Sequence, residues 1–417
     1  MTATVDVRPN RAAVQRRTLQ TLFASQVLGG VGVASGIAAG GLLAEQVSGS
    51  TTLAGFAPTS SVLGAALVAV PLARLMARRG RRPGLVAGYL LGALGAAVTI
   101  VGASVASYPL LLLGLAAFGG ATAAGLQARF AATDLAEPTR RGRSLSIVVW
   151  ATTLGIVLGP NLMEPGAWVA DRMGMPRLAG PFVFAVAAFG LALGLLQVRL
   201  RPDPLRLGPA GPDEGIAPER PSLSSTLRLI RAIPTAVLGL SAVAVGHTVM
   251  VAVMVMTPVH MYHGGATLRV IGLVISGHVA GMYALSPVMG WLVDRTGRVP
   301  VVVLGVGVLG TALALAGTAP SGHSTGLAVG LVLLGVGWSA CLVAGSTLLT
   351  EAVPAADHPR VQGASDLVMG LCGAVGGAVS GVVVGTLGFG WLALGAAPLL
   401  VALLALGMLR PRARVPA

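Results

Sequence analysis

Two pairs of residues of a kind that binds soft metal ions stand near each other in this sequence. The first pair is Met250 and Met254, and the second pair, which begins 24 residues after Met254, is His278 and Met282. Each pair has i, i+4 spacing, which places both side chains on one face of a helix. Thioether sulfur and imidazole nitrogen are soft ligands that suit cuprous copper and bind hard cations poorly. The pattern therefore predicts that these four side chains bind copper, either as one site or as a short ladder that passes the ion inward.

Other polar residues fall in or near apolar segments and are auxiliary candidates for the same site: His247, His260, His263, Gln26 and Asn161. His247 lies three residues before Met250, where it would act as an auxiliary ligand, a proton relay or a structural hydrogen-bonding group. For Met250 and Met254 alone, packing is the better explanation, because methionine commonly fills gaps in apolar helices. A histidine in the middle of an apolar segment is costly to bury, so packing alone explains His278 less well than it explains the methionines.

The composition is that of an integral membrane protein. Hydrophobic residues make up 54% of the chain and charged residues 10%, and the mean hydropathy is +0.84. Twelve apolar runs approach the ~20 residues that a helix needs to cross a bilayer. The expected fold class is an all-α membrane protein with twelve transmembrane helices, and the lipid bilayer is its first expected partner.

The basic residues predict the topology. All 28 of them are arginines, and with the N-terminus placed inside only Arg172, Arg177 and Arg269 fall on the outer side. By the positive-inside rule both termini are expected in the cytoplasm. Because topology explains the net charge of +14, no nucleic acid partner is expected. The absence of lysine indicates a GC-rich bacterial genome, and hence a multi-pass protein of the bacterial plasma (inner) membrane.

A proline-rich polar stretch divides the twelve runs six and six. The resulting domain prediction is a cytoplasmic tail (1–17), a six-helix half (18–199), a cytoplasmic linker (200–232), a second six-helix half (233–409) and a second cytoplasmic tail (410–417).

Two loops of these halves share a sequence pattern. The segment 290–298 reads G-W-L-V-D-R-T-G-R, and the segment 73–81 reads A-R-L-M-A-R-R-G-R. They align without a gap at an offset of 217 residues. Two six-helix halves with corresponding loops are typical of parallel repeats in secondary transporters.

The pattern G-x-x-x-D-R-x-G-R resembles the loop motif of the major facilitator superfamily, and the resemblance extends over essentially the whole chain. It implies the major facilitator fold, with two pseudo-symmetric halves and a charge network that latches one conformation. The residues that carry over to this latch are Gly290, Asp294, Arg295, Gly297, Arg298, Gly80, Arg81 and Asp134. The first loop has Ala73 and Ala77 where the motif has Gly and Asp, which leaves open how the first half is latched.

Gly155, Gly159 and Pro160 resemble the G-x-x-x-G-P part of the helix-5 motif of facilitator antiporters. The Gly-Gly pair that follows in that motif is replaced by Met163 and Glu164. Glycines at this spacing let another helix approach closely, and a proline bends a helix by removing a backbone hydrogen bond. The segment is therefore either a packing site or a sign of antiport.

No carboxylate falls in the middle of a predicted span. Proton-coupled drug and sugar facilitators commonly use one, so this absence weighs against them, although a histidine or a rim carboxylate such as Glu164 could carry the proton. The order and separation of the Met and His pairs resemble the motif pair of the CcoA-type copper importers, which supply copper for haem–copper oxidases. That resemblance implies that the ligands of a transported copper ion are Met250, Met254, His278 and Met282.

The expected function is secondary active transport by alternating access, with copper uptake through a Met/His site near the membrane midplane. Copper would be the substrate and not a cofactor, and a cytoplasmic copper chaperone would receive it. The alternative is uptake or efflux of a small organic molecule such as a drug, sugar or vitamin. No Walker-type or hydrolase motif is found, so an enzyme is not expected.

Overall fold

The computed structural model describes residues 11–137, 141–207, 223–320, 325–354 and 357–408. The described residues form helices and short 3-10 turns, without any strand. Twelve helical segments in this part of the chain are long and apolar enough to cross a membrane, as predicted. They are Arg11–Ser48, Thr51–Arg79, Arg81–Ser104, Tyr108–Ala131, Ile147–Met173, Arg177–Arg199, Pro234–His263, Leu268–Thr296, Arg298–Thr318, Thr325–Glu351, Arg360–Leu387 and Phe389–Met408.

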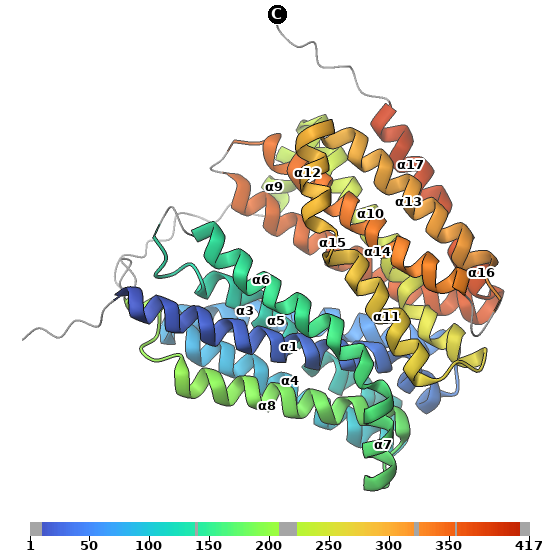
Figure 1. The fold of residues 1–417 in the computed structure, drawn as a ribbon, viewed down its shortest axis with the longest axis horizontal. Helices are drawn as coiled ribbons and strands as arrows, with labels where there is room; N and C mark the ends of the chain where they lie inside the picture. The colour runs from blue at the N-terminus through green and yellow to red at the C-terminus, as the bar shows by residue number, and fades with distance from the viewer. Residues whose placement is uncertain (1–10, 138–140, 208–222, 321–324, 355–356, 409–417) are drawn as a thin grey trace, which may run out of the picture. The chain divides into compact units, whose positions relative to one another are not determined.

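Several of these spans consist of more than one helix. The elements in chain order are α1 (Arg11–Ser48), α2 (Thr51–Ala54), α3 (Phe56–Arg79), α4 (Arg81–Ser104), α5 (Tyr108–Ala131), α6 (Arg141–Leu158), η2 (Gly159–Leu162), α7 (Met163–Met173), η3 (Arg177–Ala179), α8 (Gly180–Arg199), η4 (Leu205–Leu207), α9 (Leu223–Ala232), α10 (Pro234–His263), α11 (Leu268–Tyr283), α12 (Ser286–Thr296), α13 (Arg298–Thr318), α14 (Thr325–Glu351), α15 (His358–Leu387), α16 (Phe389–Gly395) and α17 (Ala397–Met408) (Figure 1).

Proline explains two of the interruptions. Pro160 has no N–H to donate to the preceding turn, and at this point α6 gives way to the 3-10 turn η2 before α7 continues the span. The break predicted at Pro160 is therefore present. In the eighth span, α11 ends at Tyr283 and α12 starts again with Pro287 in its first turn.

By their internal contacts the residues form two compact units. Unit 1 comprises Met1–Ile37 and Leu63–Ile216, and unit 2 comprises Ala38–Val62 and Ala217–Ala417. The boundary differs from the predicted halves, because the segment 38–62 groups with unit 2 although it precedes most of the first half in sequence.

Close packing on α15 explains why this segment belongs to unit 2. A Cβ on Gly55 would overlap the carbonyl oxygen of Gly377. Thr59 Oγ1 donates a hydrogen bond to the carbonyl oxygen of Ala374, at 2.9 Å. Small residues let two helix backbones approach in this way. Because of these contacts with α15, the segment 38–62 groups with unit 2 and not with its neighbours in sequence.

Unit 1 packs the glycine-rich face of α1 against aromatic rings of neighbouring helices. A Cβ on Gly32 would lie 2.5 Å from the ring of Phe189, and a Cβ on Gly36 would lie 2.5 Å from that of Phe118. The two rings themselves pack with centroids 5.3 Å apart. These rings fill the space that glycine leaves free, and they hold α1 against α5 and α8.

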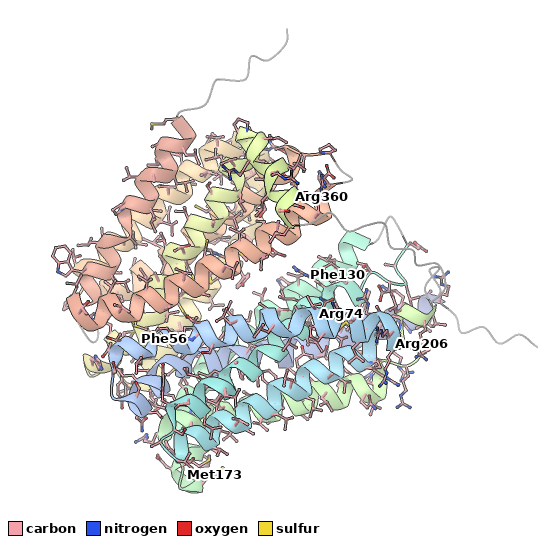
Figure 2. The ribbon with its side chains drawn as sticks, turned by 180° about the vertical axis from the view of Figure 1, so that it is seen from behind. Phe56, Arg74, Phe130, Met173, Arg206 and Arg360 are labelled. Atoms are coloured by element: carbon pink, nitrogen blue, oxygen red, sulfur yellow. The ribbon has the colours of Figure 1, made fainter. Side chains whose placement is uncertain are left out.

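The arginine-rich loops of unit 1 gather at one of its ends. Figure 2 shows Arg74 and Arg206 at this end and Met173 at the opposite end of the unit. The arrangement agrees with the predicted distribution of loops between two sides. The compartment that each side faces stays a prediction.

In unit 2, α14 occupies the central position and packs against α10, α11 and α13. Glycines make this possible, since a Cβ on Gly345 would lie 2.8 Å from the carbonyl oxygen of Gly239, and one on Gly337 would lie 3.0 Å from that of Gly305. Side chains in the middle of α14 therefore reach several neighbouring helices at once.

The predicted linker 200–232 contains the helix α9. Ile230 is buried in an apolar cluster with Leu349 and Val361, so the end of the linker is anchored on unit 2. The middle of the linker, residues 208–222, lies outside the described residues, as do 1–10 of the predicted N-terminal tail and the whole predicted C-terminal tail 410–417.

Candidate functional site

The predicted Met and His pairs lie on two helices of unit 2 that both pack on α14. Met250 and Met254 belong to α10, and His278 and Met282 belong to α11. α14 packs broadly against both helices, whereas α10 and α11 make few contacts with each other. A Cβ on Gly335 of α14 would lie 2.9 Å from the backbone nitrogen of Met282. Each pair is thus held by α14, and α14 is the element that could join them.

His278 has one satisfied and one unsatisfied ring nitrogen. Its side chain is buried, and Nδ1 lies 2.7 Å from the carbonyl oxygen of Leu331. A carbonyl can only accept, so Nδ1 carries the proton and Nε2 keeps its lone pair in the neutral ring. Nε2 is buried without a hydrogen-bond partner among the described residues. Such an atom costs on the order of 1–3 kcal/mol, so a ligand or a proton that paired with it would be stabilised.

The sulfur ligands have no histidine or carboxylate cluster beside them. Met250 and Met282 are buried and Met254 is half-buried. Within the described segments, no three His, Cys, Asp or Glu side chains gather closely enough to hold a metal ion. A copper site would therefore rest on thioether sulfurs and on Nε2 of His278, and its four ligands stay a prediction.

A second cluster surrounds Trp338 at the middle of α14, and of its members only His247 was predicted from the sequence. The indole Nε1 of Trp338 donates a hydrogen bond to Nδ1 of His247, at 3.0 Å. The ring of Tyr283 packs edge-on against the indole, with centroids 5.8 Å apart and an angle of 71°. We call His247, Tyr283 and Trp338 the α14 aromatic cluster. A tryptophan in the middle of a span needs an acceptor for its N–H, and this was the signal that could have revealed it.

The polar groups of the α14 aromatic cluster are an imidazole, a phenol and an indole, which carry no formal charge in their neutral forms. Trp338 is 5% exposed, whereas His247 and Tyr283 are half-buried. Because the indole can only donate, Nδ1 of His247 is the acceptor and Nε2 carries the proton. Nε2 faces α15 where Gly373 leaves room, since a Cβ there would lie 2.8 Å away.

Two hydroxyl groups extend this polar region. Ser339 follows Trp338 on α14, and its Oγ lies 3.0 Å from Oγ of Ser286 at the start of α12. Ser286 also donates to the carbonyl oxygen of Met282, at 3.0 Å. Both hydroxyls are thus engaged within unit 2, whereas the imidazole and phenol groups of the α14 aromatic cluster are of types that can bind a planar polar molecule through hydrogen bonds and ring contacts.

Gln26 lies in unit 1 and is fully engaged there. Its Nε2 donates to Thr152 Oγ1 at 2.9 Å and to the carbonyl oxygen of Gly125 at 3.2 Å. The hydroxyl of Tyr89 donates to its Oε1 at 3.0 Å. With 4% of its surface exposed and both amide hydrogens used, Gln26 joins α1 to α4, α5 and α6 and has no free donor for a substrate.

The other auxiliary candidates lie at helix ends. Asn161 is exposed in η2 and donates to the carbonyl oxygen of Val157, at 3.2 Å.

His260 stacks on the ring of Phe389, with centroids 4.2 Å apart. His263 Nε2 lies 3.2 Å from Oε1 of Glu45. Both histidines are 13 or more residues beyond His247 along α10, roughly 20 Å or more, so they do not belong to the α14 aromatic cluster.

Comparison with known proteins identifies the family. The model of the Major Facilitator Superfamily matches residues 21–265 and 238–417, and so covers nearly the whole chain. The chain belongs to the Major Facilitator Superfamily. It is a multi-pass membrane transporter of this superfamily, and the resemblance noted from its loop motif is confirmed at this level.

Individual relatives of this facilitator cover most of its length. It is 37% identical to the MFS-type transporter YddS of Bacillus subtilis, over 91% of this chain and 87% of the relative. It is 39% identical to YdeG of the same organism, over 89% and 86%. It is 28% identical to the riboflavin transporter RfnT of Brucella anthropi, over 86% of each chain. None of these relatives supports the resemblance to copper importers.

Solved structures agree on the fold. The facilitator superposes on an auto-inhibited peptide transporter of the POT family with a TM-score of 0.70 and 13% identity, over 96% of this chain and 99% of that one. It superposes on a bacterial homologue of the lysosomal transporter Spinster with a TM-score of 0.70 and 16% identity, over 96% and 97%. At this identity the likeness concerns the fold alone.

Three residues of the predicted latch form equivalent ion pairs in the two units of this facilitator. Arg81 pairs with Asp134 through two hydrogen bonds, of 2.8 and 3.0 Å. Arg298 pairs with Glu351 through two hydrogen bonds, of 2.8 and 2.5 Å. The partners are related by the 217-residue offset of the loop pattern, so Glu351 is the counterpart of Asp134 that the motif alone did not reveal.

Two glycines of the predicted latch shape the turns that precede α4 and α13. Gly80 precedes α4 with a φ of +98°, and Gly297 precedes α13 with a φ of +90°. Glycine tolerates such angles and other residues rarely do. Asp294 is exposed at the end of α12, beyond the half-buried Gly290. The Arg295 guanidinium lies 5.2 Å from the ring centroid of Trp291.

A carboxylate from another part of the chain caps the helix that follows the first loop. Asp203 accepts hydrogen bonds from the backbone nitrogens of Arg81 and Arg82, at 3.0 and 2.8 Å. A Cβ on Gly80 would lie 2.5 Å from its Oδ2. Asp203 therefore caps the start of α4, where the positive end of the helix favours a negative charge.

The glycines that resemble the helix-5 motif lie where α6 packs on α1. A Cβ on Gly155 would overlap the carbonyl oxygen of Val27, and one on Gly159 would lie 2.6 Å from Cβ of Ala34. This geometry supports the packing interpretation of the motif. It carries no information about the direction of transport.

Proposed function

We propose that this facilitator transports a small, planar, polar organic molecule of the vitamin class across the bacterial plasma membrane by alternating access. The observation that carries the proposal is the α14 aromatic cluster, in a chain that is 28% identical to a riboflavin transporter over 86% of its length. Among the alternatives predicted from the sequence, the relatives favour a small organic substrate over copper.

The chemistry of the cluster suits an uncharged heteroaromatic substrate. Tyr283 could pack against a flat ring system, and Nε2–H of His247 could donate to a ring nitrogen or carbonyl of the substrate. Trp338 is buried, and its hydrogen bond would hold the His247 ring in the orientation that this donation requires. The proposed transport needs no resident cofactor.

Copper is the second candidate, and one observation favours it. Nε2 of His278 is buried with its lone pair free, and Met282 follows at i+4 on the same helix. A cuprous ion could bind these two groups together with the sulfurs of Met250 and Met254. In that case a cytoplasmic copper chaperone would receive the ion.

Uptake of both substrates by the same cells separates the two candidates. Cells that require external riboflavin would express the wild type, Tyr283→Ala, the matched control Tyr283→Phe, and His278→Ala, and labelled riboflavin and copper would be measured. We expect riboflavin uptake that falls about tenfold in Tyr283→Ala, which corresponds to about 1.4 kcal/mol, and is retained in Tyr283→Phe. Riboflavin uptake no greater than in cells without the protein contradicts the organic-substrate proposal. Copper uptake that depends on His278 would support the second candidate.

A further inference from the structure

We propose that His247 is the proton-binding residue that couples this transporter to a proton gradient, and that its protonation releases Trp338. The inference rests on the proposed transport function only in that coupling needs a transported substrate. The juxtaposition that carries it is the hydrogen bond from the Trp338 indole to the unprotonated nitrogen of the His247 ring.

The hydrogen bond and the protonation compete for the same atom. Nδ1 of His247 holds the lone pair that accepts from Trp338, at 3.0 Å, while Nε2 already carries the proton of the neutral ring. A proton taken from water can therefore bind only at Nδ1. The two facing groups are then both donors, so the indole must move away and find another acceptor. When the proton returns to water, the hydrogen bond can form again.

His278 differs from His247 because a second proton on its ring would not break its hydrogen bond. Its Nδ1–H donates to the Leu331 carbonyl, so a second proton would bind at Nε2 and leave this bond intact. Protonation of His278 would therefore break no contact between helices. His278 is also 1% exposed, whereas His247 is half-buried.

On the described helices of unit 2 that pack against α10, no acidic residue stands at the level of His247 along the sequence. The titratable groups near this level on neighbouring helices are two thiols and a phenol: Cys341 of α14, whose Cβ would lie 2.8 Å from a Cβ on Gly246, Cys372 beside Gly373 on α15, and Tyr283 on α11. His278 on α11 is described above, and His260, Tyr262 and His263 lie at the far end of α10 itself.

The charged residues on the helices that pack against α10 lie toward helix ends: Arg228 and Arg231 on α9, Arg269 on α11, Arg298 on α13, Glu351 on α14, and Arg360 and Asp366 on α15. Asp366 is seven residues before Gly373, roughly 10 Å along the helix. A proton on His247 thus adds a positive charge without a nearby partner, and the neutral and charged forms favour different surroundings.

Trp338 connects the protonation of His247 to the packing of other helices. Its indole contacts His247 of α10 on one side and Tyr283 of α11 on the other. Movement of the indole would therefore loosen α10 from α14 and change the packing of α11 at the same time. A contact with two alternative arrangements is the kind of element through which a local charge change alters a larger conformation.

The test uses Trp338 as its own reporter and needs no substrate. In purified protein with Trp150, Trp168, Trp291 and Trp391 replaced by Phe, Trp338 is the sole tryptophan. A protonated imidazole in contact with an indole quenches its fluorescence. Lowering the pH through the range where histidine titrates, roughly pH 8 to 4, should give a reversible loss of emission. The loss should disappear in His247→Asn, which keeps an acceptor for the indole and cannot bind the proton.

The matched control is His278→Asn, which removes the other buried histidine and should leave the titration of Trp338 unchanged. Emission that does not change with pH, or an equal loss in His247→Asn, would overturn the proposal. Equal Trp338 emission of the two proteins at pH 8 checks that His247→Asn is folded. Should His247→Asn fail that check, His247→Gln provides a second variant for the same comparison.

A transport measurement separates this proposal from the proposed substrate. In proteoliposomes, the wild type should accumulate labelled riboflavin when a pH gradient is imposed, and any riboflavin transport that remains in His247→Asn should not respond to the gradient. Accumulation in the wild type that ignores the gradient would overturn the coupling proposal. Absence of any riboflavin transport by the wild type would overturn the substrate proposal, and the emission titration would still decide the assignment of His247.

Discussion

At the scale of single residues, hydrogen bonding distinguishes structural from functional polar side chains. Gln26, His247 and His278 are all polar residues inside apolar spans, and their types alone make them equal candidates. Gln26 uses both amide hydrogens within unit 1, so its contribution is to stability. His247 keeps an N–H and His278 keeps a lone pair without a partner in the described structure, and these two are available for a ligand or a proton.

Replacement of Gln26 by Leu should destabilise the protein. The variant removes three hydrogen bonds and leaves the Tyr89 hydroxyl and Thr152 without this partner, at a cost of about 1–3 kcal/mol. The apparent melting temperature in detergent would measure it, with Gln46→Leu, at an exposed position of the same helix, as the control. Equal melting of both variants would show that the Gln26 bonds contribute little.

At the scale of elements, glycine positions determine how closely helices approach and hence which side chains meet. The contact of α6 with α1 depends on Gly155 and Gly159, and that of α11 with α14 depends on Gly335. The same close approach brings His278 to the backbone of α14. Glycine is therefore part of the site's architecture although it contributes no chemistry.

Gly155→Ala should be destabilising because the new methyl group would overlap the carbonyl oxygen of Val27. We expect a loss of about 1–3 kcal/mol, typical of an overpacked contact. Gly190→Ala on α8 is the control, since no heavy atom lies within 4 Å of its Cβ position and alanine favours helix by up to about 1 kcal/mol. Thermal unfolding of the two variants in detergent compares them, and a neutral Gly155→Ala would contradict the packing interpretation.

Asp203 offers a test of how α4 begins. Asp203→Ala removes the acceptor of the Arg81 and Arg82 backbone nitrogens and should lower stability by about 0.5–2 kcal/mol, as loss of an N-cap does. Asp203→Asn keeps one oxygen acceptor and should lose less. Thermal unfolding at low salt would measure both, and an Asp203→Ala variant as stable as the wild type would argue that water replaces the cap.

At the scale of the whole molecule, the internal repeat preserves one ion pair but places it in two environments. The Arg81–Asp134 side chains are 17% and 11% exposed, whereas those of Arg298 and Glu351 are 34% and 50% exposed. A buried charge left without its partner is costly, whereas an exposed ion pair contributes little to stability. The two ion pairs thus occupy equivalent sequence positions but contribute unequally to stability.

Arg81→Gln should therefore reduce stability more than Arg298→Gln does. The first variant leaves the Asp134 carboxylate poorly solvated, while the second leaves Glu351 in contact with water. The shifts in apparent melting temperature at low and high salt would compare them. A larger effect of Arg298→Gln would contradict this ranking.

Local chemistry made part of this protein predictable. Hydropathy located all twelve spans, Pro160 marked the break in the fifth span, and the loop motif identified both arginines of the repeated ion pair. Each of these features depends on residues close together in sequence or on a repeated pattern. The Met and His pairs were found by the same reasoning, and their copper-binding role stays a prediction.

The sequence by itself determined the class of protein, because apolar length, charge asymmetry and loop motifs act through the membrane and need no knowledge of packing. Only the tertiary structure decided which side chains meet. Asp203 caps a helix that starts 122 residues earlier, Trp338 holds a histidine 91 residues away, and the segment 38–62 groups with the second unit. Such pairs form where glycines let distant helices come into contact. The local sequence of an apolar span does not predict which other helix will pack against it.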